Sequence, residues 1–369
     1  MRTRVSDEFG LEFPIFAFSH CRDVVVAVSK AGGMGVLGAL YFTPEELEIE
    51  LQWIDEHIDG RPYGVDVVMP ATVIDTAGFD PENLESQLED MIPQANRDFV
   101  EATLERFGVP ELPPDLETPH HLLGWTDATA RPQVEVALAH PISLLVNALG
   151  PPPKDVVDLA HEHGIKVAAL ASTADHARKH VALGVDIVVA QGTEAGGHTG
   201  EISSVVLWPE VIDAVDVPVL AAGGIGRGSQ IAGALAMGAE GVWTGSIWLT
   251  VAESDMSPAV VEKLLAANSR GTVRSRSMTG KPARLLRTAW TDAWDSPESP
   301  GTLPMPLQFM LTAEALQRIT RADNRDLVGM PVGQVVGSMN DVKPVRDVMF
   351  ELVDEYVTAT ERLDRITQA

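Results

Sequence analysis

The sequence is short of cysteine, of basic clusters and of long apolar runs, and each scarcity excludes a class of protein. The single cysteine, Cys21, leaves no partner for an intrachain disulfide, and it suits the reducing cytoplasm, where we expect the protein. The formal net charge is −26 and Lys and Arg form no cluster, so we expect neither a nucleic-acid nor an anionic membrane partner. No run reaches the roughly 18 apolar residues that a membrane span needs, and residues 1–20 lack a signal-peptide pattern.

The abundant residues, Ala, Val, Leu and Gly, form short apolar runs that alternate with amphipathic segments. This alternation is typical of parallel strands covered by helices. Eight runs, each followed by a helical segment, predict a closed (β/α)₈ TIM barrel, with an open doubly wound sheet as the alternative. The predicted strands are 13–18, 35–39, 63–68, 142–149, 165–171, 186–190, 217–222 and 241–244.

The pattern also divides the chain. Residues 1–255 are assigned to the barrel, interrupted after the third strand by an insertion at 70–131 that is rich in Pro, Asp and Glu and has a predicted helix over 82–107. Residues 256–345 are interpreted as a smaller helical domain that caps the barrel and helps to bind substrate. The last segment, 346–369, predicts an amphipathic helix that packs back on the barrel and whose apolar face could serve a homodimer.

The segment 191–200 reads Gln-Gly-Thr-Glu-Ala-Gly-Gly-His-Thr-Gly and follows the sixth predicted strand directly. It presents His198 between glycines at the C-terminal end of a strand, where barrel enzymes place their chemistry. A neutral imidazole is a good general base near pH 7, and we assign that role to His198; a hydrogen bond to a backbone carbonyl is the structural alternative. Glu194 either orients this histidine or bonds within the loop.

Two further loops predict an anion site. Gly223-Gly224 follows the seventh strand and Gly245-Ser246 follows the eighth, which is the usual phosphate position in such barrels. Glycines leave backbone N–H groups free to face an anion, and the helix that opens near Gly228 would add a favourable dipole.

Other candidate residues have weaker assignments. His20 follows the first strand and is expected to pack or to contact substrate, while Asp66, within the third strand, must be paired or neutral. Lys281 and Arg284 could bind an anion, although a solvated face is the default for them. The pair His120-His121 has no ligand-spaced partner, so no metal site is expected.

These motifs together identify a family resemblance. The chain resembles the nitronate monooxygenases, formerly called 2-nitropropane dioxygenases, among the FMN-dependent TIM-barrel flavoproteins. The loop 191–200 is close to the family signature Gln-Gly-x-Glu-Ala-Gly-Gly-His-x-Gly. Further matches are 31–35, 64–66, 221–225, Gly245-Ser246, 279–284 and 332–334.

The resemblance implies a flavin site and a reaction. FMN would lie at the C-terminal ends of the strands, and His198 would take the α-proton of a nitroalkane, which O₂ and the flavin would oxidise to a carbonyl compound and nitrite. Phe18 and His20 would contact substrate. The implied cofactor-binding residues are Gln191, Gly192, Ala195, Gly196, Gly197, Gly223, Gly224, Gly245, Ser246, Asp66, Ser172 and Gln334.

The chain departs from the family pattern where substrate choice and flavin tuning are set. Residues 17–20 replace a Gln-x-Pro-Met type segment, and Asp66 replaces an asparagine. Some relatives carry a lysine near the end of the fifth strand, where this chain has Leu170-Ala171-Ser172. An NAD(P)H-dependent FMN reductase acting on quinones or enoyl thioesters is therefore the alternative, and a non-enzymatic ligand-binding barrel is the third hypothesis.

Overall fold

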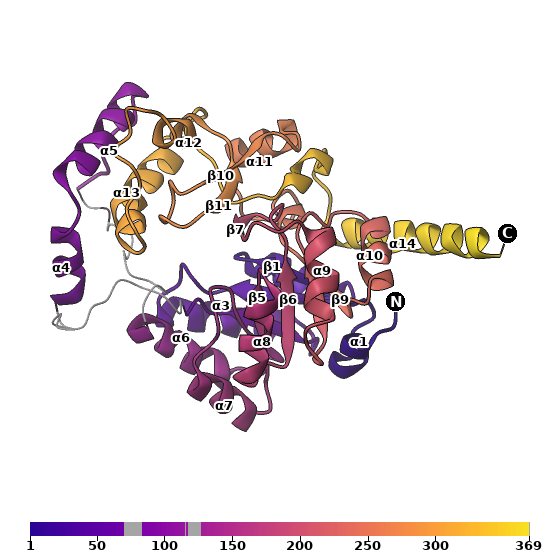
Figure 1. The fold of residues 1–369 in the computed structure, drawn as a ribbon. Helices are drawn as coiled ribbons and strands as arrows, with labels where there is room; N and C mark the ends of the chain where they lie inside the picture. Colours follow the sequence, from indigo (N-terminus) through magenta and orange to yellow (C-terminus); the bar gives the residue numbers. More distant parts are fainter. Residues whose placement is uncertain (70–82, 115, 117–126, 369) are drawn as a thin grey trace.

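The computed structural model describes residues 1–69, 83–114, 116 and 127–368, and its centre is a closed barrel of parallel strands (Figure 1). The first and last barrel strands pair with each other, which confirms the (β/α)₈ prediction and excludes an open sheet. All eight predicted strands are present, with ends that differ by no more than two residues. The barrel strands are β1 (Ile15–Ser19), β2 (Met34–Gly38), β3 (Tyr63–Asp66), β4 (Leu144–Asn147), β5 (Lys166–Ala171), β6 (Ile187–Gln191), β8 (Val219–Ala222) and β9 (Gly241–Thr244).

Side chains alternate across the barrel wall because successive residues of a strand point to opposite faces. The inward set forms one hydrophobic cluster that includes Phe16, Val36, Val146 and Ala222. Outward residues pack against surrounding helices. These helices are α2 (Arg22–Lys30), α3 (Pro44–His57), α6 (Asp127–Ala139), α7 (Lys154–Glu162), α8 (Ala174–Ala182), α9 (Ser204–Ile212) and α10 (Gly228–Ala236), with α1 (Arg4–Phe9) before β1.

The start of α3 illustrates how local sequence sets a boundary. The Thr43 hydroxyl accepts a hydrogen bond from Glu46 N–H at 3.1 Å, and the Glu46 carboxylate accepts one from Thr43 N–H at 2.8 Å. This reciprocal capping box satisfies two N–H groups that have no partner inside the helix, and Pro44 occupies the first helical position.

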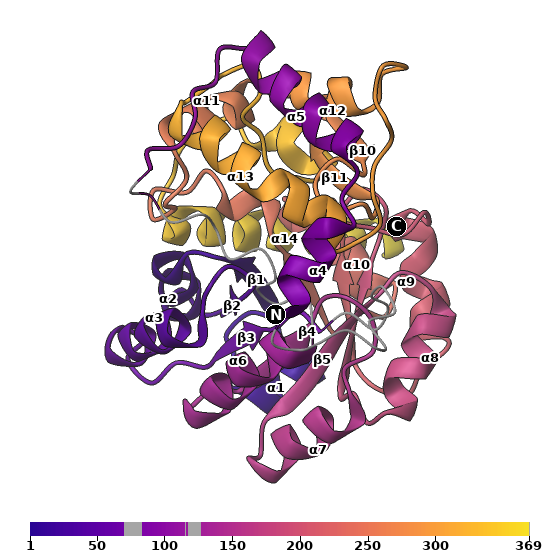
Figure 2. The ribbon, with the colours of Figure 1, turned by 90° about the vertical axis from the view of Figure 1, so that its left-hand side faces the viewer.

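A second layer covers one side of the barrel (Figures 1 and 2). Its helices are α4 (Leu84–Asp90), α5 (Gln94–Arg106), α11 (Pro258–Ala266), α12 (Ala289–Trp294) and α13 (Leu307–Arg321). The insertion contributes α4 and α5, and both contact α13. The Arg318 guanidinium on α13 is buried and donates to the Glu101 carboxylate of α5 at 2.9 Å, which ties the two segments together. We call this layer the cap.

Two expectations for these segments need correction. The single helix predicted over 82–107 is wrong, because the chain forms two helices with Pro93 at the N-cap of the second. Helix α6 begins at Asp127, inside the stretch that was assigned to the insertion. The pair His120-His121 lies outside the described residues.

The cap also contains a three-stranded sheet that the sequence did not predict. Its order is β10-β11-β7, where β10 spans Thr272–Ser275, β11 spans Ala283–Leu286 and β7 is only Gly197–His198. Strand β7 belongs to the loop that follows barrel strand β6, so this loop leaves the barrel and pairs with the cap.

Helix α14 (Val345–Thr367) crosses α10 and α2 and then projects beyond the barrel (Figure 1). Its Met349 and Leu352 are buried. Gly228 permits the close approach, because a Cβ there would lie 2.0 Å from the Leu352 carbonyl oxygen. Among the described residues, no helix is both long enough and apolar enough to cross a membrane.

Candidate active site at the barrel mouth

The alternation of the strands aims several predicted site residues into the barrel at its C-terminal end. Phe18 pairs with Val36, and Asp66 pairs with Val146, and both partners belong to the inward cluster. Gln191 pairs with the inward Ala222. Phe18, Asp66 and Gln191 therefore face the mouth of the barrel, the end at which barrel enzymes carry their active sites.

His198 is held by the cap. In strand β7 it pairs with Ala283 of β11, and its Nε2 lies 2.7 Å from the Thr279 hydroxyl, which is fully buried. The hydroxyl therefore orients the imidazole. In the tautomer that donates Nε2–H to Thr279, the basic nitrogen is Nδ1.

The surroundings of His198 keep its ring neutral. Desolvation, assisted by the positive charge of Lys281, lowers the pKa of His198 to about 4. Desolvation also lowers the pKa of Lys281. At neutral pH the imidazole is therefore unprotonated and able to accept a proton, which is the state that a general base requires.

Glu194 bonds to the start of helix α9. Its carboxylate accepts the Ser204 N–H at 3.1 and 3.2 Å, and Ser204 is the first residue of α9. A carboxylate at this position satisfies a free helix N–H group and interacts favourably with the helix dipole. The two roles predicted for Glu194 were to orient His198 or to bond within the loop; its carboxylate instead caps the following helix.

The predicted cofactor residues converge around this loop. Gln334, in the short helix η3 (Gln334–Ser338), donates its N–H to the Glu194 carbonyl at 2.9 Å. The Ser246 hydroxyl accepts the Gly333 N–H at 2.9 Å. A Cβ at Gly196 would lie 2.8 Å from the backbone of Gly333, so a larger residue would push the two segments apart. These bonds bring the loops after β6 and β9 together with η3.

The two glycine loops differ in how much room they leave. Gly223 and Gly224 have φ values of 106° and 68°, which favour glycine, and both line a cavity of about 570 Å³ together with Gln334 and Arg227. A Cβ at Gly245 would meet no atom closer than 3.9 Å. The cavity therefore lies beside Gly223-Gly224, whereas at Gly245 a side chain would make ordinary contacts with Phe18.

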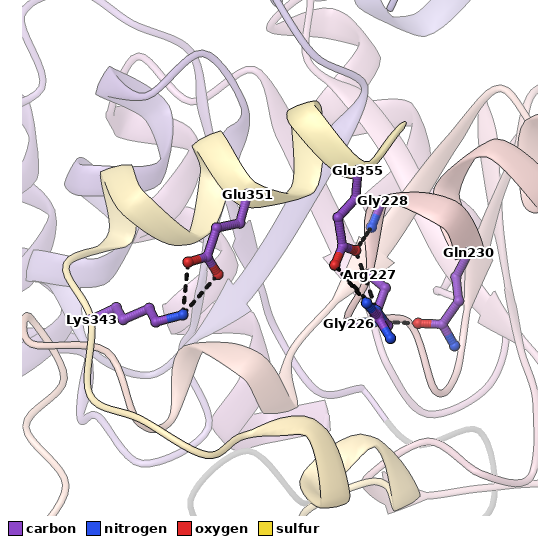
Figure 3. A network of polar contacts seen from close by, with 7 residues as sticks. All are labelled: Gly226, Arg227, Gly228, Gln230, Lys343, Glu351 and Glu355. Atoms are coloured by element: carbon purple, nitrogen blue, oxygen red, sulfur yellow. Dashed lines mark hydrogen bonds and ion pairs between the residues drawn. The ribbon is translucent and has the colours of Figure 1, made fainter. Parts of the chain in front are cut away.

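The N-terminus of α10 is already paired. Glu355 of α14 accepts the Gly228 N–H at 2.9 Å and also binds the Arg227 guanidinium, as Figure 3 shows. In the same view Gln230 accepts the Gly226 N–H at 2.9 Å. The expectation that the Gly228 end of this helix would face a phosphate is therefore corrected: its first amide faces a carboxylate of the chain itself.

Arg284 is also not a solvated residue. It is buried, and its guanidinium donates to the Thr193 carbonyl at 3.0 Å and to the Thr272 hydroxyl at 3.1 Å. The default of a solvated face was therefore wrong for Arg284, which instead holds the 191–200 loop against the cap.

An aromatic group lies at the C-terminal ends of β1 and β2. The ring centroids of Phe18 and His20 are 5.1 Å apart, and those of His20 and Tyr41 are 4.8 Å apart. His20 Nδ1 lies 2.8 Å from the Gly38 carbonyl oxygen, so it donates there and carries the proton, leaving Nε2 as the acceptor. Burial lowers the pKa of His20, so its ring is neutral.

Asp66 is the buried acid of the mouth. Asp66 is 2% exposed. One of its carboxyl oxygens accepts the Ala148 N–H, and Oδ1 has no hydrogen-bond partner among the described residues. Desolvation raises the pKa of Asp66 to about 8. The sequence expectation of a paired or neutral acid is met by the neutral form.

Ser172 lies beside the far end of the histidine loop. Its Oγ is 3.2 Å from His176 Nδ1, and a Cβ on Gly200 would meet the Ser172 side chain at 2.5 Å.

The contact of Thr279 with His198 was not predicted from the sequence, although the segment 279–284 was one of the motifs that the sequence offered. The available signal was a threonine two residues before Lys281 in that motif.

The chain has clear relatives. The family model described as nitronate monooxygenase matches residues 3–355. A Mycobacterium tuberculosis protein named as a monooxygenase is 52% identical, with all of both chains covered. The structure of a nitroalkane oxidase from Streptomyces ansochromogenes matches with a TM-score of 0.81 and 26% identity, covering 97% of this chain and 99% of the other. FabK from Thermotoga maritima matches with a TM-score of 0.76 and 26% identity, covering 99% of each chain.

Proposed function

Because this chain belongs to the nitronate monooxygenase family, we propose that it is an FMN-dependent enzyme that oxidises alkyl nitronates or nitroalkanes with O₂ to a carbonyl compound and nitrite. The observation that carries the proposal is the neutral His198, which Thr279 orients at the barrel mouth. The family match bears out the resemblance stated from the motifs, and the chain is an oxidoreductase.

The residues at the mouth fit FMN. Gly197 has no atom within 4 Å of the place of its missing Cβ, a Cβ at Gly245 would make only ordinary contacts with Phe18, and among the described residues the buried Oδ1 of Asp66 lacks a partner that a ligand would supply. Gly224 and Gly245-Ser246 would hold the phosphate, and Gln191, Asp66 and the 195–197 backbone would hold the ring system. When bound, FMN would accept electrons from the nitronate and allow reaction with O₂.

The protein's own part in the reaction is proton removal. The imidazole of His198 would take the α-proton of a neutral nitroalkane while its contact with Thr279 holds the ring in place. The nearby charge of Lys281 would stabilise the anionic nitronate that this transfer leaves behind. Phe18 and His20 would form an aromatic wall of the substrate site.

Replacement of His198 tests the proposal. We expect His198→Asn to lower kcat for a neutral nitroalkane about 100- to 10,000-fold, the usual contribution of a general base. A pre-formed anionic nitronate needs no proton removed, so its oxidation should be spared and serves as the internal control. Oxidation of the nitroalkane at the wild-type rate would refute the role of His198.

A reductase is the second candidate, because FabK resembles the chain over almost its whole length. Anaerobic mixing of the flavin-loaded protein with NADH or NADPH separates the two. Rapid bleaching of the flavin absorbance would favour a reductase, whereas a flavin that stays oxidised favours the monooxygenase. Purified protein that neither contains nor takes up FMN would favour a non-enzymatic barrel.

We also propose that the enzyme works in the cytoplasm, since its one cysteine is buried and free.

We further propose a homodimer that forms through the exposed apolar residues of α14, among them Phe350 at 70% and Ile366 at 57% exposure. Sedimentation of the full chain as a monomer at micromolar concentration would contradict the dimer.

A further inference from the structure

Among the acidic groups that the structure describes, Asp66 is unusual because it is buried, points into the barrel and has an oxygen without a partner there. It is 2% exposed, and its neighbours in the sheet are Gly38 on one side and Val146 on the other, neither of which can pair with a carboxyl group through a side chain. A buried ionised carboxylate without a cation is strongly disfavoured. The geometry of β3 therefore favours a neutral acid facing the ligand site.

The two oxygens of Asp66 have different surroundings. One accepts the Ala148 N–H, which an un-ionised carbonyl oxygen can do, and Oδ1 is left to carry the proton toward the mouth. The pyrimidine edge of a flavin offers carbonyl oxygens and a ring nitrogen as acceptors. A carboxylic O–H is a matching donor, whereas a carboxylate could only accept and would oppose the negative charge of a reduced flavin.

We propose that Asp66 binds FMN as an un-ionised carboxylic acid that donates its Oδ1 proton to the flavin, so that the protein releases FMN when this acid ionises. The inference rests on the proposed FMN-dependent function and adds to it a pH limit on cofactor retention. The raised pKa of about 8 at Asp66 places that limit just above neutral pH.

Other titratable groups face the same space and must be separated from Asp66. The loops after β1 and β2 bring His20, whose pKa is lowered, and Tyr41, whose pKa is raised, so both are neutral between pH 7 and 9. From the cap, His198 is neutral in this range, and burial lowers the pKa of Lys281, so Lys281 must be separated from Asp66 by the experiment. The described residues of β2 and β4 carry no titratable side chain.

The experiment measures FMN release from the full-length, FMN-loaded protein. The holoprotein is diluted at pH 7, 8 and 9, and free FMN is followed by its fluorescence. If FMN binds only the protonated form, the apparent Kd follows the protonated fraction and rises about tenfold between pH 7 and pH 9. Asp66→Asn keeps the shape and the donor but cannot ionise, so its Kd should stay constant over the same range.

The possible outcomes separate a failure of the Asp66 inference from a failure of the proposed FMN-dependent function. A wild-type Kd that is flat from pH 7 to 9 overturns the inference and leaves the FMN enzyme intact. An equal rise in wild type and Asp66→Asn assigns the effect to another group, such as Lys281, and also overturns it. Protein that binds no FMN at any pH overturns the proposed function, and the inference with it.

Discussion

The close packing of α14 on α10 can be tested with one substitution, because it depends on the missing side chain of Gly228. A Cβ at Gly228 would lie 2.0 Å from the Leu352 carbonyl oxygen and 2.3 Å from the Tyr356 nitrogen. Both are backbone atoms of a helix and cannot rotate away. To restore an ordinary contact of 3.4 Å, α14 would have to retreat by about 1.4 Å, which loosens the packing of the buried Met349 and Leu352.

We therefore expect Gly228→Ala to destabilise the protein. Overpacking in a close contact costs about 1–3 kcal/mol, and we place this variant at the upper end because the neighbours are backbone. For a chain of 369 residues, 1 kcal/mol corresponds to about 1.3 °C in Tm, so Tm should fall by about 4 °C.

Gly233 supplies the matched control. It lies in the same helix, and a Cβ there would meet nothing within 4 Å. Gly233→Ala should raise Tm by about 1 °C, because alanine favours the helix by about 0.5–1 kcal/mol. Thermal unfolding followed by circular dichroism measures both variants at the same FMN loading. Equal Tm values for the two variants would refute the packing argument.

Two further predictions concern the site and its support. Thr279→Val keeps the shape of a fully buried residue but removes the partner of His198, so kcat for a neutral nitroalkane should fall about tenfold while oxidation of the pre-formed nitronate is unchanged. Steady-state kinetics with both substrates check this, and an equal loss with both would indicate a merely structural role. Glu355→Gln should lower Tm by about 1 °C at pH 7, because the carboxylate binds Arg227 and the Gly228 N–H. Arg227 lowers the pKa of Glu355, so the stabilisation is present above the unfolded pKa of about 4.3 and disappears as pH falls through the lowered value; melting curves at pH 7 and pH 3 that differ equally from wild type would contradict this.

The barrel was predictable because its information is local. Each strand is a short apolar run with turn residues behind it, and boundaries such as the Thr43 capping box are written in four consecutive residues. The break between α4 and α5 was equally local, since Pro93 marks it, and its omission was an error of interpretation. The three-stranded sheet was not predictable in this way, because β7 has two residues and exists only by pairing with β11.

In the candidate site, too, the features set by local sequence were predictable and those set by distant contacts were not. The glycine loops and His198 could be placed from their positions after strands. Their partners could not, because Arg284 reaches a carbonyl 91 residues away and Glu355 reaches an amide 127 residues away. The neutral state of Asp66 was open from the sequence; in the part of the barrel that the structure describes, its burial and its unpartnered Oδ1 favour that state.

The pairing of β7 with β11 limits how such enzymes can be recombined. A chimaera that received the cap of a relative, in order to admit a different substrate, would also receive a new β11 and new residues in place of Thr279 and Lys281. The strand that pairs with the His198 loop, the hydroxyl that contacts its ring and the charge that helps to lower its pKa would change with them. Under the proposed function, an exchange of the cap would therefore change the surroundings of the proposed base together with the substrate site.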